Sequence, residues 1–357
     1  MSDQAPGTGL IPAAIRSLAR MPLPDAASRL AVRMVLGRKR HSLANADPAA
    51  TATFARAMAD FPMSAPVNLD LPLCDVPADF FKLVLGPQRK FSCGLYPSDA
   101  TTLEEAEEAA LCETARHAAL RNGQTVLEIG CGWGSLSLWM ARHYPASRIV
   151  AVASCNSQRA YIEAQAAERG IRNLRVITAN VNAFRPAQRF DRVVSVETFE
   201  HLPNWAEILG RMRTWLTPDG RVFLHVVTHA TTPYLTRNTS ADLFGRPALG
   251  GGIMPSERLI HEFSSSVTVE QSWRWSGEHY ARTAEDWLRN FDRHGAEIRE
   301  IFKETYGAEA PMWYRRWRLF FLATAEQFGH RRGREWGVSH YVLRPALGAD
   351  RGRSKRD

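Results

Sequence analysis

The sequence predicts an α/β protein with a doubly wound parallel sheet, and two observations support this. From Thr125 onward, short β-branched runs alternate with helix-length segments, as in a parallel sheet. Each run is also almost continuously apolar, as strands buried on both faces must be. The expected strands are TVLEIG (125–130), RIVAVA (148–153), RVITA (175–179), FDRVVSVE (190–197) and GRVFLHVVTH (220–229).

The segments around these strands differ in character. Residues 1–90 have the irregular apolar spacing and proline content of short helices and loops, which predicts a helical N-terminal cap. After His229 come a Gly/Pro-rich loop, an aromatic stretch, a helical region from about 283 to 328 and a last apolar run, GVSHYVLRP. We therefore expect a main domain over residues 91–345 and a basic flexible tail over 346–357.

Composition and charge exclude several classes of protein. With 45% hydrophobic and 23% charged residues, the chain has an ordinary globular composition, and no apolar run is long enough to span a bilayer. The net charge of +8 lies at the two ends: residues 1–41 and 328–357 each carry an excess of five positive charges. The nearly neutral middle argues against a nucleic-acid partner and leaves at most peripheral membrane contact.

The cysteines and the first residues bear on compartment. Cys74, Cys93, Cys112, Cys131 and Cys155 are an odd number without Cys-x-x-Cys pairs, so we expect reduced thiols and no metal site. The start lacks the features of a secretory signal, and a cytoplasmic location is expected.

A glycine-rich turn follows the first strand, in the segment EIGCGWG (128–134). Glycines there let backbone N–H groups approach a ligand at the start of the next helix. The spacing is GxGxG rather than GxGxxG, and the second strand leads into Ser154 without the acidic residue that would bind a ribose in a dinucleotide site. Both features argue against NAD.

The motif VLEIGCGWG is typical of S-adenosylmethionine-dependent methyltransferases, and roughly residues 80–345 resemble one branch of them. The chain resembles the cyclopropane-fatty-acid synthase group, most closely its coclaurine N-methyltransferase type. The blocks are FSCGLYPSDATTLEEAEEAAL (91–111), VLEIGCGWGSLSLWMA (126–141), FDRVVSVETFEHLPNW (190–205), GGIMPSERL (251–259) and WSGEHYARTAEDWL (275–288). The resemblance implies a class I methyltransferase (Rossmann-like) fold and an inserted lid at about 232–300.

The resemblance also implies a cofactor site for S-adenosylmethionine. It assigns the methionine part to Gly130 and Gly132, the ribose to Ser154 and Gln158, and the adenine to Asn180. Gly134, in the same loop, is also expected to bind the cofactor. The family commonly has Asp at the last position, but an Asn carbonyl still accepts a hydrogen bond from an adenine amino group. Glu128 either contacts the ligand or caps amides of the loop.

At the end of the fourth strand, Glu197, Glu200 and His201 match the residues that hold and deprotonate the amine in the N-methyltransferase branch. Parallel strands meet the ligand crevice at their carboxyl ends, where a carboxylate or imidazole could remove a proton from an amine. The structural alternative is that Glu200 caps the next helix and His201 packs beneath a loop.

A second set matches the lipid branch, in which Cys, Glu, His and Tyr hold a bicarbonate ion that deprotonates a carbocation. The counterparts are Cys93, Glu200, His225 and Tyr280. Alternatively, Cys93 is a small buried hydrophobe and His225 a satisfied core histidine.

These observations favour an enzyme that transfers a methyl group to the nitrogen of a small aromatic or cyclic amine. The alternative is C-methylation or cyclopropanation of an unsaturated fatty-acyl lipid, with bicarbonate as a second cofactor and a role in lipid metabolism. The basic segment 15–40 could then lie on anionic lipid as an amphipathic helix. The sequence leaves a homodimer open.

Overall fold

The computed structural model describes residues 24–60, 76–236 and 252–346. Four parts of the predictions lie outside the described residues: the expected tail beyond Ala346, the first part of the N-terminal cap, Cys74, and residues 237–251 of the expected lid. The strands are β1 (Thr125–Ile129), β2 (Arg148–Ala153), β3 (Leu174–Thr178), β4 (Phe190–Val196), β5 (Leu216–His229), β6 (Tyr234–Leu235), β7 (Ile253–Met254), β8 (Val267–Ser276) and β9 (Trp336–Pro345).

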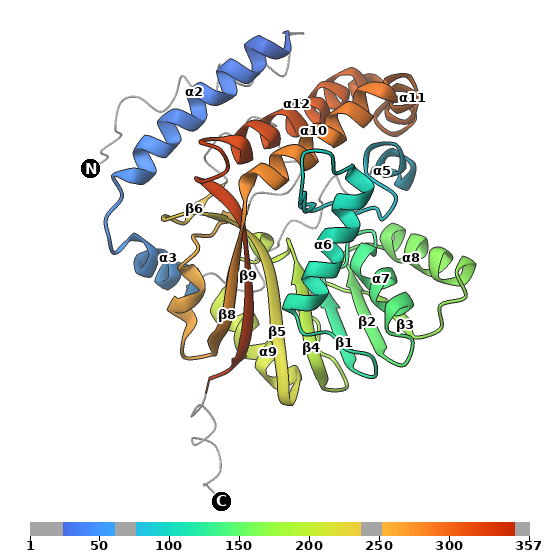
Figure 1. Ribbon diagram of the computed structural model, residues 1–357, viewed down its shortest axis with the longest axis vertical. Helices are drawn as coiled ribbons and strands as arrows, with labels where there is room; N and C mark the ends of the chain where they lie inside the picture. The colour runs from blue at the N-terminus through green and yellow to red at the C-terminus, as the bar shows by residue number, and fades with distance from the viewer. Residues whose placement is uncertain (1–23, 61–75, 237–251, 347–357) are drawn as a thin grey trace, which may run out of the picture.

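Seven of these strands form one sheet in the order β3-β2-β1-β4-β5-β9-β8, shown in Figure 1. The five expected strands are confirmed and pair in parallel. The sheet is mixed, however, and not parallel throughout as expected, because β9 pairs antiparallel with both β5 and β8. β8 is an edge strand with mostly exposed polar positions, so it lacks the continuous apolar run that identified the others.

The expected lid at 232–300 therefore contains a strand of the central sheet. Its remaining described parts are β6 and β7, which form a separate two-stranded sheet, the short helix η3 (Leu259–Phe263) and part of the helical layer.

Helices cover both faces of the sheet, because its strands alternate between two apolar clusters. Val126 of β1 packs with α6 (Leu103–His117) and α7 (Ser135–His143), whereas the next residue, Leu127, packs with α9 (Trp205–Trp215) and α3 (Ala50–Ala59). α8 (Asn156–Glu168) packs beside β2 and β3. β1 lies between β2 and β4, where the strand order reverses, and such a reversal opens a crevice at the carboxyl ends of the strands.

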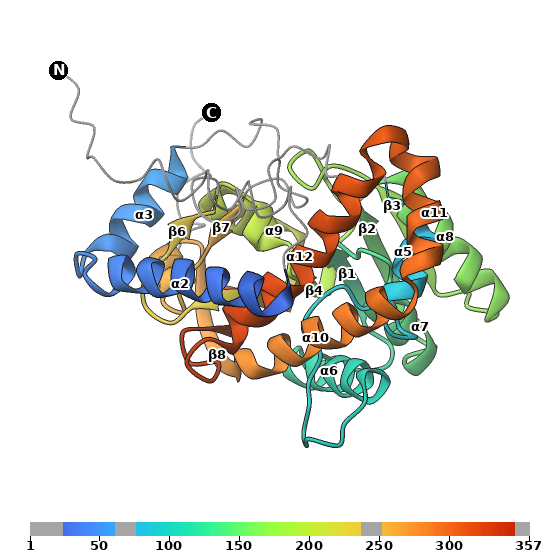
Figure 2. The ribbon, with the colours of Figure 1, turned by 90° about the horizontal axis from the view of Figure 1, so that it is seen from above.

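A third layer lies across that end of the sheet (Figures 1 and 2). It consists of α2 (Asp25–Ala44), α5 (Ala78–Val84), α10 (Gly277–Arg293), α11 (Gly295–Tyr306), η4 (Gly307–Glu309) and α12 (Ala310–Gly329). The apolar faces of the α-helices in this layer form one large cluster. Arg29 of α2 donates to Glu285 of α10 at 2.6 Å and to Glu326 of α12 at 2.9 Å. These ion pairs hold α2 over the crevice.

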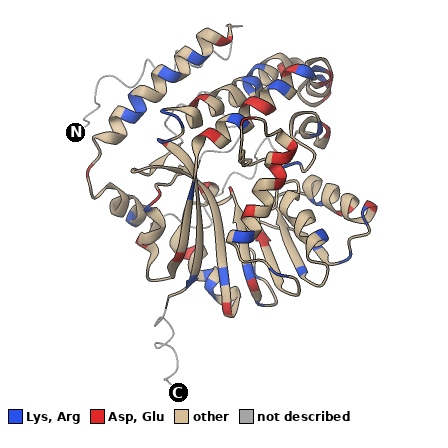
Figure 3. Ribbon diagram, viewed as in Figure 1, with Lys and Arg blue, Asp and Glu red and all other residues tan. Residues whose placement is uncertain are grey.

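The surface of the described residues carries mixed charge. Lys and Arg are interspersed with Asp and Glu along the helices and strands in Figure 3. Among the described helices, none combines the length and apolarity needed to cross a membrane.

Candidate functional site

A deep pocket opens at the carboxyl ends of β1, β2 and β4, beneath α2 and α12. Ten of the sequence-predicted site residues line it. They are Glu128, Gly130, Gly132, Ser154, Gln158, Asn180, Glu197, Glu200, His201 and Tyr280. Gly134, Cys93 and His225 are not among the lining residues. The pocket has a polar half at the glycine loop and an apolar half under the helices.

The three glycines of the loop have different tasks, although all have positive φ. A Cβ on Gly130 would lie 2.0 Å from Thr198 Oγ1, and one on Gly134 would lie 2.6 Å from Ile162 of α8. These two glycines allow the loop to pack against the protein. A Cβ on Gly132 would meet no heavy atom of the described chain within 4 Å. Gly132 is therefore the glycine whose backbone a ligand can approach.

Glu128, the last residue but one of β1, has a buried carboxyl group that lines the pocket. Its Oε2 accepts a hydrogen bond from the Ser137 hydroxyl of α7. Burial raises the pKa of Glu128 to about 7, and the Ser137 hydrogen bond opposes that shift. A buried carboxyl group at this position is suited to binding a cation.

The turn after β2 and the segment after β3 complete the polar half. Ser154 donates from its hydroxyl to Gln158 Oε1 at 2.9 Å, which fixes the amide at the start of α8. Asn180 Oδ1 accepts the backbone N–H of Asn182 at 2.9 Å and keeps a second lone pair, because an amide oxygen has two. The arrangement presents hydroxyl and amide groups of the kind that bind a ribose and a purine.

Glu197, the first residue after β4, is at the centre of the site. It has φ 48°, which costs a non-glycine residue about 1 kcal/mol. The turn directs its carboxylate between the sheet and α10. The side chain is 12% exposed, and burial raises the pKa of Glu197, whereas the Lys90 ammonium lowers it.

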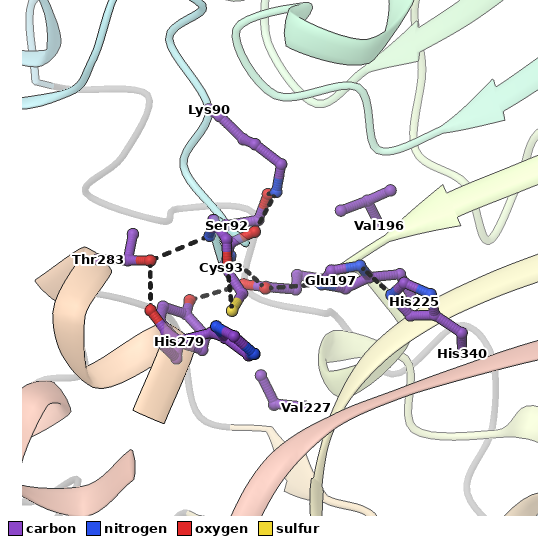
Figure 4. Close-up of polar contacts among 12 residues, drawn as sticks. Lys90, Ser92, Cys93, Val196, Glu197, His225, Val227, His279, Thr283 and His340 are labelled. Carbon is purple, nitrogen blue, oxygen red and sulfur yellow. Dashed lines mark hydrogen bonds and ion pairs between the residues drawn. The ribbon is translucent and has the colours of Figure 1, made fainter. Parts of the chain in front are cut away.

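Three of the predicted bicarbonate ligands converge on the Glu197 carboxylate, as Figure 4 shows in part. Tyr280 donates its hydroxyl to Oε2 at 2.7 Å, and Cys93 donates its backbone N–H to Oε1 at 2.9 Å. His225 Nε2 lies 3.1 Å from Oε1. The Cys93 thiol points away and donates to Gly94 O at 3.1 Å. The set thus surrounds a carboxylate that belongs to the chain.

Glu200 and His201 lie on the short helix η1 (Phe199–His201). Glu200 Oε1 accepts the Val227 N–H at 2.6 Å, whereas Oε2 is buried with no hydrogen-bond partner among the described residues. Burial, followed by the charge of Glu197, raises the pKa of Glu200 to about 8. Burial lowers the pKa of His201, so this imidazole is neutral at pH 7.

The structural alternative for Glu200 is wrong, because the next helix, α9, is capped by Asn204, whose side chain accepts the N–H of Glu207 at 3.0 Å. Gly252 presses against η1 instead, since a Cβ there would lie 2.3 Å from Glu200 O. This close contact fixes the helix that carries both side chains.

The apolar half of the pocket was not expected from the sequence. α2 contributes Val32 and Leu36, and α12 contributes Phe320 and Phe328. Sequence reasoning also missed Lys90, which lines the pocket. It is 2% exposed and donates to Ser92 Oγ at 2.5 Å and to Cys93 O at 2.6 Å. A lysine next to the FSCGLYP block looks solvated, and no pattern marked it.

Comparisons with known proteins identify the family to which the chain belongs. A family model described as mycolic acid cyclopropane synthetase matches residues 73–334. (S)-coclaurine N-methyltransferase of Papaver somniferum is 33% identical over 282 residues, which cover 78% of this chain and 80% of that protein.

Two solved structures extend the comparison. A crystal structure of coclaurine N-methyltransferase bound to N-methylheliamine and SAH superposes with a TM-score of 0.88 at 31% identity, covering 94% of this chain and all of that one. The cyclopropane synthase MmaA2 from Mycobacterium tuberculosis superposes with a TM-score of 0.65 at 25% identity, covering 78% of this chain and 98% of that one.

Proposed function

The chain belongs to the mycolic acid cyclopropane synthetase family and is an S-adenosylmethionine-dependent methyltransferase, and from that premise we propose that it methylates the nitrogen of a small aromatic or cyclic amine. The observation that carries the proposal is Oε2 of Glu200, which is buried in the pocket and has no hydrogen-bond partner in the described part of the chain. Two relatives whose names include (S)-coclaurine N-methyltransferase, at 33% and 34% identity, support it.

The polar half of the pocket fits the cofactor. S-adenosylmethionine supplies a methyl group on a sulfonium, together with an ammonium, a ribose and an adenine. We assign the ammonium to Glu128, whose buried carboxyl group gains a cationic partner, and the close backbone approach to Gly132. Ser154 and Gln158 bind the ribose and Asn180 the adenine. Gly134 does not contact the cofactor in this assignment, but it allows the loop to pack against Ile162.

Glu200 and His201 handle the acceptor. An amine that arrives as an ammonium ion brings a positive charge that lowers the pKa of Glu200 from its raised value of about 8, so the carboxyl group gives up its proton to solvent and ionises. The ammonium then donates an N–H to Glu200 Oε2, an atom that is buried with no hydrogen-bond partner among the described residues. His201, neutral at pH 7, takes one proton and leaves the nitrogen lone pair free to attack the methyl group. The product is again an ammonium ion, since it takes over the positive charge that the sulfonium loses.

The apolar half favours an aromatic or cyclic acceptor. Phe320 and Phe328 of α12 and Met254 of β7 line it. Aromatic rings and a thioether attract flat ring systems, and ring faces also stabilise a nearby cation.

The residues do not fit a bicarbonate ion. The donors that would hold one, the Tyr280 hydroxyl, the Cys93 N–H and His225 Nε2, all lie within hydrogen-bond distance of Glu197. A second anion beside Glu197 would be repelled. We therefore favour nitrogen methylation over cyclopropanation or C-methylation of a lipid.

The test supplies cofactor with a fully deuterated methyl group to the enzyme, together with a panel of cyclic and aromatic amines and a total lipid extract. Mass spectrometry should find an amine product that keeps all three deuterons. A lipid that gains a carbon but has lost one deuteron would overturn the proposal, because a carbocation would then have been deprotonated.

Two variants sharpen the test. Glu200→Gln should lower turnover by about 10²–10⁴-fold, the usual size of a lost proton-handling group, with cofactor affinity nearly unchanged. Cys93→Ala should lower it by no more than about tenfold, since the Glu197 contact comes from the backbone N–H, whose hydrogen bond survives the substitution. A hundredfold loss in Cys93→Ala would instead indicate chemistry at the thiol.

A further inference from the structure

Three buried imidazoles join Glu197 to the outside of the molecule. His225 Nδ1 of β5 lies 2.8 Å from His340 Nε2 of β9. His340 Nδ1 lies 2.7 Å from His117 Nδ1 at the end of α6. Figure 4 shows the inner part of this row of hydrogen-bonded side chains, from Glu197 through His225 to His340. Each contact is short enough for a hydrogen bond.

Aromatic packing holds the rings in place. His117 stacks on Trp273 of β8 with ring centroids 3.7 Å apart, and His340 packs against Trp275 at 4.3 Å. The rings therefore cannot turn without breaking these contacts.

All three imidazoles are neutral at pH 7. Burial lowers the pKa of His117 to about 4 and holds those of His225 and His340 well below the usual histidine value. A neutral imidazole has one N–H donor and one nitrogen acceptor. The row therefore has only two consistent arrangements, with all N–H groups directed toward Glu197 or all directed toward the surface.

The surface end selects between these arrangements. Arg116 Nη2 lies 2.8 Å from His117 Nε2, and an arginine can only donate. Both carboxylate oxygens of the neighbouring Glu113 already accept from Arg116, at 2.7 and 2.6 Å, so His117 Nε2 accepts from the guanidinium. Its Nδ1 then carries the hydrogen and donates to His340. His340 Nε2 in turn donates to His225, whose Nε2 donates to Glu197.

We propose that Arg116 is a positioning residue that acts through His117 and His340 to hold His225 as a hydrogen-bond donor to Glu197, and so keeps that carboxyl group ionised. The proposal deepens the proposed function and rests on it only for the location of Glu197 beside the acceptor. An anionic Glu197 that accepts three hydrogen bonds is held rigidly, and its negative charge attracts a cationic amine. A protonated Glu197 would lose that charge.

A competing acceptor makes the arrangement reversible. Glu113 Oε1 lies 3.0 Å from His117 Nε2 and 2.6 Å from Arg116 Nη2. Without Arg116, Glu113 attracts a hydrogen onto His117 Nε2, and every donor in the row reverses. His225 then presents a bare nitrogen to Glu197, which must take up a proton to satisfy it.

Other charged and titratable groups also face Glu197 and influence its pKa. They are Lys90 and Cys93 from the segment before α6, Glu200 and His201 from η1, His225 from β5, and Tyr280 from α10. Substitution of Arg116, whose side chain is 63% exposed, leaves all of these in place. A change at the active site after that substitution therefore reports on the row.

The first test reads the tautomers directly and needs no substrate. In ¹⁵N-histidine-labelled enzyme, the ring nitrogens of His225, assigned by their loss in His225→Asn, should show the Nε2–H tautomer. Arg116→Ala should convert His225 to the Nδ1–H tautomer, and Arg116→Lys, which keeps a donor, should restore Nε2–H. An unchanged His225 tautomer in Arg116→Ala overturns the proposal.

The second test uses the pH dependence of kcat/KM. Loss of the donor should move the acid limb of the Arg116→Ala profile upward by about one pH unit, the usual weight of a hydrogen bond to a charged group. Arg116→Lys should keep the wild-type limb, and so should Arg159→Ala, which removes another exposed arginine that forms an ion pair on its own helix. A tautomer change without this shift overturns the link to Glu197. If no amine is a substrate, only the first test bears on the proposal, so the two failures can be distinguished.

Discussion

The pH dependence of cofactor binding tests the assignment of Glu128 to the ammonium of S-adenosylmethionine. The carboxyl group is buried and lines the pocket, and its pKa is raised to about 7. The amino group of the ligand remains protonated throughout the neutral range. Binding therefore requires the ionised carboxyl group, and we expect affinity to fall as the pH falls through 7.

The size of the effect follows from that pKa. For a pKa of about 7, the ionised fraction falls from about nine-tenths at pH 8 to about one-tenth at pH 6. The dissociation constant of S-adenosylhomocysteine should rise about tenfold over this range, or about 1.4 kcal/mol of binding free energy. Ser137→Ala removes a hydrogen bond that lowers the pKa of Glu128. The affinity of this variant for S-adenosylhomocysteine should therefore begin to fall about one pH unit higher than that of the wild type.

Isothermal titration calorimetry with S-adenosylhomocysteine at several pH values measures both effects. Glu128→Gln is the matched control, because it keeps the shape of the side chain and removes the titrating group. Its affinity should be lower and independent of pH between 6 and 8. A wild-type affinity that does not change with pH, or an equal change in Glu128→Gln, would refute the assignment.

Two further predictions concern packing around the pocket. Gly130→Ala should lower the free energy of unfolding by about 3 kcal/mol, because the new Cβ would overlap Thr198. Gly132→Ala should lower it by only about 1 kcal/mol but should weaken cofactor binding. Denaturant titration measures the stabilities and calorimetry the affinities, and equal behaviour of the two variants would contradict this prediction. Glu326→Gln should raise the KM for the acceptor about tenfold, because the lost ion pairs with Arg29 and Arg33 loosen α2 over the apolar half of the pocket. The affinity for the cofactor should stay within about twofold of the wild-type value. Steady-state kinetics that show equal effects on acceptor and cofactor would contradict this prediction.

The sequence predicted the parallel half of the fold because strands buried on both faces leave an unmistakable pattern. β1 to β5 follow the expected runs within a few residues. β8 escaped because an edge strand with polar positions has no such pattern, and its antiparallel pairing with β9 depends on contacts across about 70 residues of chain.

The candidate site was predictable where a motif carries its own geometry. Gly130 and Gly132, together with Glu197, Glu200 and His201, line the pocket, because both segments directly follow a strand. The partners of these residues come from distant segments. His225 was considered as an anion ligand, but neither its neighbour His340 nor the link to His117, which is 223 residues from His340, leaves a trace in local sequence.

The position of β9 has a consequence for how the molecule assembles. This strand, the last one described, inserts between β5 and β8, and it places His340 against His225 across 115 residues of sequence. Until β9 is made, β5 is an open edge with unpaired backbone groups, a template for aggregation. Closing so long a loop is slow. The nascent chain can thus form the parallel strands that carry the cofactor site early. The sheet and the surroundings of Glu197 are completed only later, when β9 inserts.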